Sequence, residues 1–411
     1  MRLRLAAAAA LAVPLAAGSA SAAKQPVPNW AAAQIQTVVA DGLMDASSSA
    51  SFHPNDPLTQ QALAGLTYQL SRMLAPAAST EPTASPGPLG GGGARARTTA
   101  SDGAPGDPPP SDTSPPASTV TDPTTTTPDP DEPAPASQPP QVSNPDAPVT
   151  LAQLDAQLVA SLGLSVAAAE FAAGARASGV KVPARFGTEV VARLLGLRTN
   201  HPAAEDDLEL RPQDPATRAE AAYSAAVILG FGSLGASSQT AAVQPLADSF
   251  ALPVLDPWQQ RILTVAFSKI GMPYIWGGTS DGPEAPFGVR SRGGYDCSGF
   301  VWRVYKLQKY PDEGTLASTL RGRTTYAMAG EVPRSERISY SDLQPADVIF
   351  FGAHGPRSTP AQVGHMGIYI GDGWFIHSSD YGVALAQLTG WYRKEFAWGR
   401  RPLQEAGLTT S

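Results

Sequence analysis

The C-terminal part of the chain carries two kinds of hydrophobic periodicity. Residues 258–270 place apolar side chains at helical spacing, which predicts an amphipathic helix with Ile262, Leu263, Ala266, Phe267 and Ile270 on its inner face. Residues 365–370 and 374–379 read as two strands around Gly371-Asp372-Gly373, which predicts a β-hairpin. Together these elements predict an α+β domain over residues 252–403.

Upstream of this domain the pattern is helical and recurs. Trp30 begins one helical pattern, and a second carries Leu63, Leu66 and Leu70; a similar pair begins at Phe186 and after Thr217. A partial copy follows Thr150. Each second helix comes after Asp, Pro and Thr residues, which supply N-cap oxygens and a proline in the first turn. The recurrence predicts small all-α repeat regions at 26–75 and 146–235, packed on one another.

A stretch without periodicity separates these copies. Residues 76–149 hold 19 of the 40 prolines, a run of four glycines from Gly90 and no aromatic residue, so residues 76–145 are expected to form a disordered linker. The same stretch, 76–149, holds nine acidic and two basic residues of the chain's 36 and 29, which leaves 27 of each sign elsewhere. This balance argues against a nucleic-acid partner.

The N-terminus predicts export. Met1-Arg-Leu-Arg4 precedes an apolar Ala/Leu/Val run, and Ala20 and Ala22 fit an A-x-A cleavage site, so residues 1–22 are expected to be a signal peptide. The run is shorter than the roughly 20 residues of a stable membrane span; an uncleaved anchor is the alternative. No cysteine follows the run, so no lipid-modified N-terminus is expected.

The single cysteine of this exported chain is either a buried, inert residue or a thiol kept for its reactivity. Cys297 stands between Asp296 and Ser298 at the start of a predicted helix. Unpaired amide groups and the helix dipole at that position favour an anion, so we expect a lowered pKa for the thiol and donors for a developing oxyanion. The position favours a reactive nucleophile.

A thiol nucleophile needs a base, and the chain has five histidines. His53 and His201 lie in the repeat regions, and His354 in a probable surface loop. In the hairpin, a three-residue loop pairs residue 367 with His377, which brings His365 and His377 to one face as diagonal neighbours. Gly367 leaves room for an imidazole. We expect His365 to act as base and acid and His377 to orient it. A metal pair is the alternative, but no third ligand is evident, and no metal or cofactor is expected.

Four stretches, in order, resemble the NlpC-type cell-wall peptidase family: Tyr274-x-Trp-Gly-Gly, Asp296-Cys-Ser-Gly-Phe, residues 346–351, and His365-Met-Gly-Ile-Tyr-Ile-Gly with His377 twelve residues later. The resemblance covers about residues 257–402. It implies a papain-like fold with a nucleophile helix on an antiparallel sheet, and a catalytic triad of Cys297, His365 and His377. It further implies that Tyr274 lines the site and that Asp296 and Ser298 recognise a free amine of the substrate. Each of these three side chains has a structural alternative, as packing, helix cap or local hydrogen bond.

The helical copies resemble S-layer homology repeats, best in the copy with Asp214, Thr217, Arg218 and Glu220. The first copy departs from the pattern at Gln60 and Gln61. The resemblance implies non-covalent binding to a cell-wall polymer; a helical spacer without a ligand is the alternative.

These observations predict a secreted, wall-associated peptidoglycan endopeptidase that acts through a thioester acyl-enzyme. The resemblance to the NlpC-type family implies that it cuts stem peptides between γ-D-glutamate and the following diamino acid. An amidase or acyltransferase with the same triad, and an inactive wall-binding protein, are the alternatives. Residues 311–341 and 353–363 look like insertions and are expected to form loops at the rim of the cleft.

Overall fold

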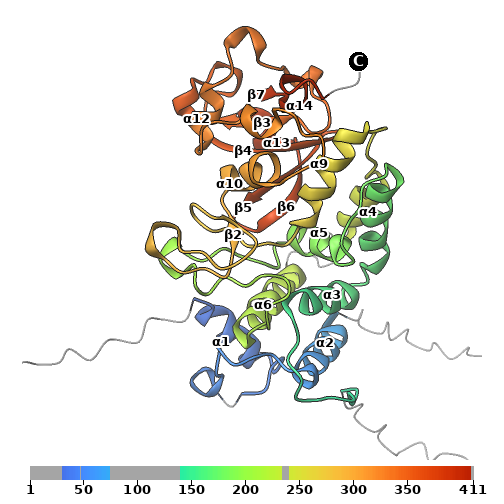
Figure 1. Ribbon diagram of the computed structural model, residues 1–411. Coiled ribbons are helices and arrows are strands. Elements are labelled where there is room, and N and C mark those ends of the chain that lie inside the picture. The colour runs from blue at the N-terminus through green and yellow to red at the C-terminus, as the bar shows by residue number, and fades with distance from the viewer. Residues whose placement is uncertain (1–29, 47, 75–138, 234–239, 409–411) are drawn as a thin grey trace, which may run out of the picture. The chain divides into compact units, whose positions relative to one another are not determined.

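The computed structural model describes residues 30–46, 48–74, 139–233 and 240–408, all within one compact unit (Figure 1). The predicted signal peptide and most of the predicted linker lie outside the described residues. The linker was expected to reach residue 145, but residues 139–145 are placed and lie beside the helix that begins at Gln60. The amide of Gln61 donates to the carbonyl of Pro145 at 3.1 Å.

The C-terminal domain is built on a five-stranded antiparallel sheet of order β6-β5-β4-β3-β7. The mixture of helices with this sheet confirms the predicted α+β class. The strands are mostly buried, as their Val, Ile and Phe content leads one to expect. Their bounds are β3 Val348–Gly352, β4 Val363–Gly371, β5 Trp374–Ser379, β6 Gly382–Gln387 and β7 Phe396–Arg400. A separate two-stranded sheet joins β1 Thr279–Ser280 to β2 Gly294–Tyr295.

The hairpin of β4 and β5 has the predicted register. Ile368 pairs with Ile376 and Tyr369 with Phe375, so Gly367 stands opposite His377. The turn is tighter than the expected three-residue loop, because Gly371 pairs with Trp374 and the register shifts between Tyr369 and Gly371. A β-bulge absorbs the extra residue, which leaves the pairing beyond it unchanged.

The predicted helix 258–270 is α9, Pro257–Ser268, with Asp256 as N-cap and Pro257 in its first turn. In the same domain, α10 packs against β4 and β5, and α12 packs against β4. The domain's other helices are α10 Cys297–Trp302, α11 Leu316–Thr319, α12 Thr325–Gly330, α13 Gly390–Glu395 and α14 Pro402–Glu405. The helical region comprises α1 Ala32–Ala40, α2 Gln60–Leu74, α3 Leu151–Ser161, α4 Ser165–Ala177, α5 Phe186–Leu194, α6 Arg218–Ser233 and α8 Val243–Asp248.

Three equivalent segments, residues 57–59, 148–150 and 215–217, meet in a closed ring of backbone hydrogen bonds. Leu58 N–H donates to Ala216 at 2.8 Å, Ala216 to Val149 at 2.9 Å, and Val149 to Leu58 at 3.0 Å. Each segment ends in a threonine whose hydroxyl accepts from an amide in the first turn of the next helix, at 3.2–3.3 Å. The three Asp/Pro/Thr stretches of the sequence thus join α2, α3 and α6 at their N-termini. The resemblance to S-layer homology repeats stays a prediction.

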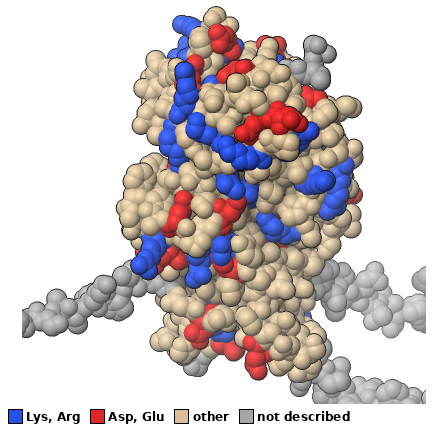
Figure 2. Space-filling model, viewed as in Figure 1, with Lys and Arg blue, Asp and Glu red and all other residues tan. Residues whose placement is uncertain are grey.

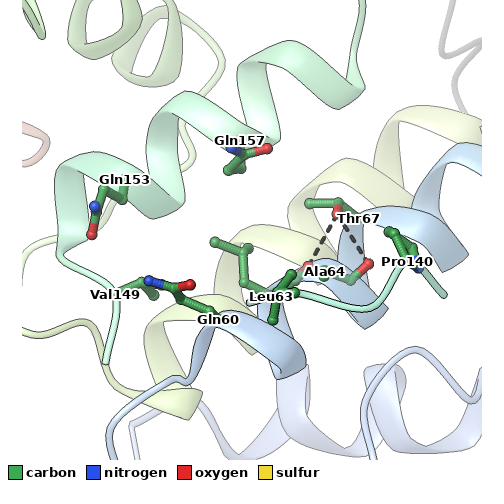
Figure 3. A pocket seen from close by; sticks show the side chains of 9 residues that line it. Gln60, Leu63, Ala64, Thr67, Pro140, Val149, Gln153 and Gln157 are labelled. Atoms are coloured by element: carbon green, nitrogen blue, oxygen red, sulfur yellow. Dashed lines mark hydrogen bonds between the residues drawn. The ribbon is translucent and has the colours of Figure 1, made fainter. Parts of the chain in front are cut away.

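A groove opens between α2 and α3 (Figure 3). Its volume is about 390 Å³. Leu63, Ala64 and Val149 line its apolar part, and Gln60, Gln153, Gln157 and Thr67 supply amides and a hydroxyl. No charged side chain is among the residues that line it. The groove can therefore accept a neutral ligand with hydrogen-bonding groups.

The helical region and the C-terminal domain share a hydrophobic core. Phe171 of α4 and Trp374 of β5 lie with their ring centroids 5.9 Å apart, and Phe250 lies 5.4 Å from Trp374. Arg193 Nη2 on α5 donates to the carbonyl of Gly271 at 2.9 Å, and Arg185, the N-cap of α5, donates to the carbonyl of Ser268 at 2.9 Å. The helical region thereby holds the loop that leads from α9 into Tyr274.

Within the described ranges, no single helix is long and apolar enough to span a membrane. Helices α3 and α4 meet the length and hydropathy requirement only as a pair, with a bend of 118° between them. On the face shown in Figure 2, basic and acidic side chains are interspersed.

Candidate active site

Cys297 begins α10, as the sequence predicted, and Asp296 is the N-cap. The Asp296 carboxylate accepts hydrogen bonds from the amides of Gly299 and Gly277, the latter at 3.0 Å. Position 299 requires glycine, because a Cβ there would stand 1.9 Å from the carbonyl oxygen of Gly278. The nucleophile turn is therefore held tightly against the loop that carries Tyr274 and Gly277.

The sulfur of Cys297 faces polar groups. Its side chain is 8% exposed, and Sγ lies 3.3 Å from the hydroxyl of Thr325 on α12. The backbone N–H groups of Ser298 and Met366 are also directed at it. Because Met366 follows His365 on β4, these contacts bring the nucleophile against the strand that carries the predicted base.

The predicted lowering of the thiol pKa is wrong. Burial raises the pKa of Cys297 to about 11, and the nearby Asp296 carboxylate adds to the rise. The Thr325 hydroxyl and the amides of Ser298 and Met366 lower it, as the helix-terminus argument supposed, but desolvation of the thiolate outweighs them. Cys297 is accordingly a neutral thiol at neutral pH.

His365 and His377 converge as predicted. His365 Nε2 and His377 Nδ1 lie 2.8 Å apart, and the two rings meet edge to face with centroids 5.0 Å apart. A Cβ on Gly367 would stand 3.1 Å from the Cβ of His377, so His377 packs closely against the glycine on the neighbouring strand. Phe351 stacks on His365 at 5.7 Å, and Tyr392 lies 5.3 Å from His377, so aromatic rings fix both imidazoles.

Both imidazoles are neutral at neutral pH. Burial lowers the pKa of His365 to about 4 and lowers that of His377 well below its ordinary value, with the charge of His365 contributing to the latter. The contact through Nε2 leaves His365 Nδ1 free to accept a proton. In the tautomer of His365 that carries its proton on Nε2, Nε2–H donates to His377 Nδ1 and Nδ1 is the basic nitrogen.

Arg323 is the residue that the sequence reasoning missed. Its Nη1 donates to Ser298 Oγ at 2.7 Å, and its two Nη atoms contact the carboxylate oxygens of Asp296 at 3.2 Å each. Nη2 also donates to the carbonyl of Gly277 at 2.8 Å. Arg323 and Thr325 lie in the segment 311–341, which was interpreted as an insertion, although it supplies two contacts to the nucleophile turn.

These contacts bear on the roles of Asp296 and Ser298. Both residues are buried, and each side chain is already bonded to Arg323. Recognition of a substrate amine by this pair stays a prediction. The geometry favours a positioning role for Asp296 and Ser298, since the Arg323 guanidinium already occupies the position beside the carboxylate where a substrate amine would bind.

Tyr274 is half-buried and lies among acidic groups. Burial raises its pKa well above the ordinary value, and the charges of Cys297, Asp296, Asp380 and Asp206 add to the rise. Asp206 belongs to the helical region, and burial raises its own pKa to about 6. Tyr274 thus lies close to the nucleophile, where it was expected, and the helical region contributes to its surroundings.

The remaining histidines lie elsewhere. His354 is exposed before a short 3-10 turn, as predicted, and His201 is buried against Trp30 with ring centroids 4.5 Å apart. Among the described residues, no group of three or more His, Cys, Asp or Glu side chains is arranged to hold a metal ion.

The C-terminal part of the chain is similar to known proteins. The NlpC/P60 family model matches residues 271–401. The chain is 33% identical over 134 residues to the probable peptidoglycan endopeptidase LytE of Bacillus subtilis, covering 33% of this chain and 31% of LytE. It is 29% identical over 139 residues to the gamma-D-glutamyl-L-lysine dipeptidyl-peptidase of Bacillus subtilis, covering 33% of this chain and 38% of that one.

Among solved structures, an NlpC/P60 family protein from Bacillus cereus matches with 28% identity and a TM-score of 0.27, over 37% of this chain and 42% of that one. This chain spans less than two fifths of the length of either curated relative. The predicted resemblance to a cysteine-type cell-wall peptidase is confirmed over residues 271–401, which match the NlpC/P60 family model.

Proposed function

We propose that this protein is a peptidoglycan endopeptidase in which Cys297 is the nucleophile, His365 the base and acid, and His377 the residue that orients His365. The observation that carries the proposal is the 2.8 Å contact between the two imidazoles on the strands beside the buried sulfur. The name of LytE, a probable peptidoglycan endopeptidase, supports peptidoglycan as the substrate class. The name of the other curated relative, the dipeptidyl-peptidase, supports the bond after γ-D-glutamate as the bond that is cut.

The proposed reaction begins with a neutral thiol and a neutral imidazole. As the sulfur attacks the scissile carbonyl, the thiol proton passes to His365 Nδ1, and a tetrahedral intermediate forms. His365 then gives this proton to the leaving amine, and the C–N bond breaks to leave a thioester on Cys297. Water then attacks the thioester and gives a proton to His365. The C–S bond breaks, His365 returns the proton to the sulfur, and the carboxylic acid product leaves as the thiol is regenerated. The low pKa of His365 makes its protonated form a strong acid toward the leaving amine.

The test is hydrolysis of defined muropeptides followed by mass analysis. Cys297→Ala is expected to abolish fragment release while leaving the secondary structure unchanged. Release of fragments by Cys297→Ala would contradict the nucleophile assignment. Product masses also separate an endopeptidase from an amidase or acyltransferase, because each class cuts or forms a different bond.

We further propose that the protein is secreted and associated with the wall, where its helical region binds a neutral wall polymer in the groove between α2 and α3. The observation in favour is the lining of that groove, which offers three glutamine amides over an apolar floor without a charge. Binding of the Cys297→Ala protein to purified walls is expected to weaken in Gln60→Ala and Gln157→Ala. Gln36→Ala, at an exposed position of α1, is the matched control. Equal retention of all these variants would refute the proposed groove.

A further inference from the structure

The surface of the NlpC/P60 domain carries an unusual set of exposed aromatic residues. Among the described residues, the aromatic side chains in the most exposed class are Trp276, Phe287, Tyr326, Tyr381 and Trp391, at 46–81%. All five lie in this domain, whereas the described aromatic residues of the helical region are buried or half-buried. Single exposed aromatic residues are ordinary, but this concentration in one domain marks a binding surface. We call these five side chains the aromatic rim.

Trp391 lies beside the histidine pair. Its ring stacks on Phe351 with centroids 6.4 Å apart and planes 24° apart, and Phe351 stacks in turn on His365. The neighbouring Tyr392 lies 5.3 Å from His377. Trp391 is nevertheless 56% exposed, so only one layer of aromatic side chains separates its solvent-facing surface from the base.

Tyr326 follows a residue that contacts the nucleophile. The hydroxyl of Thr325 lies 3.3 Å from the sulfur of Cys297, and Tyr326, the next residue of α12, is 57% exposed. The rim therefore has one member on each of two helices that contact the site: α12, through Thr325, and α13, through Tyr392.

The other members flank Tyr274 and the end of β5. Trp276 is two residues from Tyr274, and Tyr381 lines a small cavity together with Tyr274. Phe287 lies over the same loop, since a Cβ on Gly277 would stand 2.5 Å from its ring. Every member of the rim is thus tied to a segment that carries, or contacts, a residue of the site.

We propose that the aromatic rim binds sugar rings of the glycan strand to which the stem peptide is attached. This inference rests on the proposed function. A pyranose ring has an apolar C–H face that packs on a flat aromatic side chain, while its hydroxyls stay in water. The stem peptide is covalently joined to the glycan, so a peptide bound at Cys297 brings sugar rings to the surface around the site.

The arrangement of the rim favours a glycan over a protein partner. Within the described part of the chain, no two of the five rings contact one another, so they offer separate flat platforms and no continuous apolar patch. A protein interface has a contiguous apolar centre that excludes water. Separate platforms suit a chain of ring-sized units instead.

Binding to peptide-free glycan strands tests the rim independently of catalysis. In the Cys297→Ala background, Trp391→Leu and Tyr326→Leu are expected to weaken binding about tenfold, because leucine keeps an apolar side chain but lacks the flat face. Trp391→Phe is expected to retain most of the affinity. Val254→Ala, at a 99% exposed apolar residue before α9, is the matched control.

A kinetic comparison completes the test. In the active protein, Trp391→Leu is expected to lower kcat/KM on intact peptidoglycan by a larger factor than kcat/KM on free stem peptide. Equal losses on the two substrates, or unchanged glycan binding in both leucine variants, would overturn the inference. If the unmodified protein cleaves neither substrate but the leucine variants lose glycan binding, the proposed function fails and the rim stands.

Discussion

Replacing Arg323 with methionine is expected to slow the reaction of Cys297 without displacing the two histidines. Methionine has a similar length and no charge, so Asp296 and Ser298 lose their common partner while the volume is nearly kept. The guanidinium makes contacts of 2.7 Å to Ser298 and of 3.2 Å to each carboxylate oxygen of Asp296. The histidines lie on β4 and β5 and make none of these contacts.

The size of the effect follows from what is left unpaired. A fully buried ion pair that loses one partner costs about 3–5 kcal/mol. Here the Arg323 side chain is 32% exposed, so solvent screens part of the charge, and the amides of Gly277 and Gly299 still bond to the carboxylate. We therefore expect a loss of stability of about 1–3 kcal/mol, the range for one unsatisfied buried group. The unpaired carboxylate also raises the pKa of Cys297 further, and each unit lowers the thiolate fraction about tenfold.

The assay is the rate of alkylation of Cys297 by iodoacetamide as a function of pH. Arg323→Met should react more slowly than the unmodified protein below the thiol pKa, and the exposed Arg357→Met is the matched control. Adding Asp296→Asn removes the unpaired charge and keeps a good N-cap, so the double variant should recover much of the rate. A double variant no faster than Arg323→Met, or an Arg323→Met protein that reacts at the original rate, would refute this reasoning.

Three further predictions concern the histidine pair. Because His365 has its pKa lowered to about 4, it is neutral above that pH and charged below it, so kcat/KM should hold a plateau through neutral pH and fall only in strong acid; an acid limb near the ordinary histidine pKa would contradict this. His377→Ala should lower kcat/KM about 5- to 150-fold, because an unpaired buried Nε2–H on His365 costs about 1–3 kcal/mol. His377→Asn keeps an acceptor and should lower kcat/KM by a smaller factor. Equal losses of kcat/KM in the two variants would contradict a role for the hydrogen bond. Gly367→Ala should displace His377, because the new Cβ would stand 2.8 Å from the carbonyl oxygen of Ile376 and 3.1 Å from His377 Cβ. NMR of the imidazole nitrogens would detect the lost contact between His365 and His377. Unchanged spectra would contradict the register.

The parts of the site that the sequence predicted correctly depend on local rules. Side chains alternate strictly along a strand, so the pairing of residue 367 with His377 followed from the two strands and their loop. The bulge near Ile370 could not be foreseen, but it left that pairing intact. Likewise, Asp before Cys297 and apolar residues after it are sufficient to predict a capped helix.

The parts that the sequence did not predict depend on contacts between distant residues. Arg323 reaches Asp296 and Ser298 from 27 and 25 residues away, and nothing in its own neighbourhood marks it as part of the site. The pKa of Cys297 was predicted in the wrong direction for the same reason. The helix start is a local property and lowers the pKa, whereas burial is a property of the whole fold and raises it.

The helical region is joined to the site through buried charges, and this explains why the two parts share one core. On α5, Arg193 is 3% exposed and pairs with Glu189, and both contact Gly271: the guanidinium donates to its carbonyl, and the carboxylate fills the space where a Cβ would stand. Gly271 has a φ of +84°, a conformation that glycine adopts without strain. It lies three residues before Tyr274, so the direction in which the chain enters the active-site loop is set by side chains of the helical region. Contacts between buried groups consequently link the helical region to the loop that carries Tyr274.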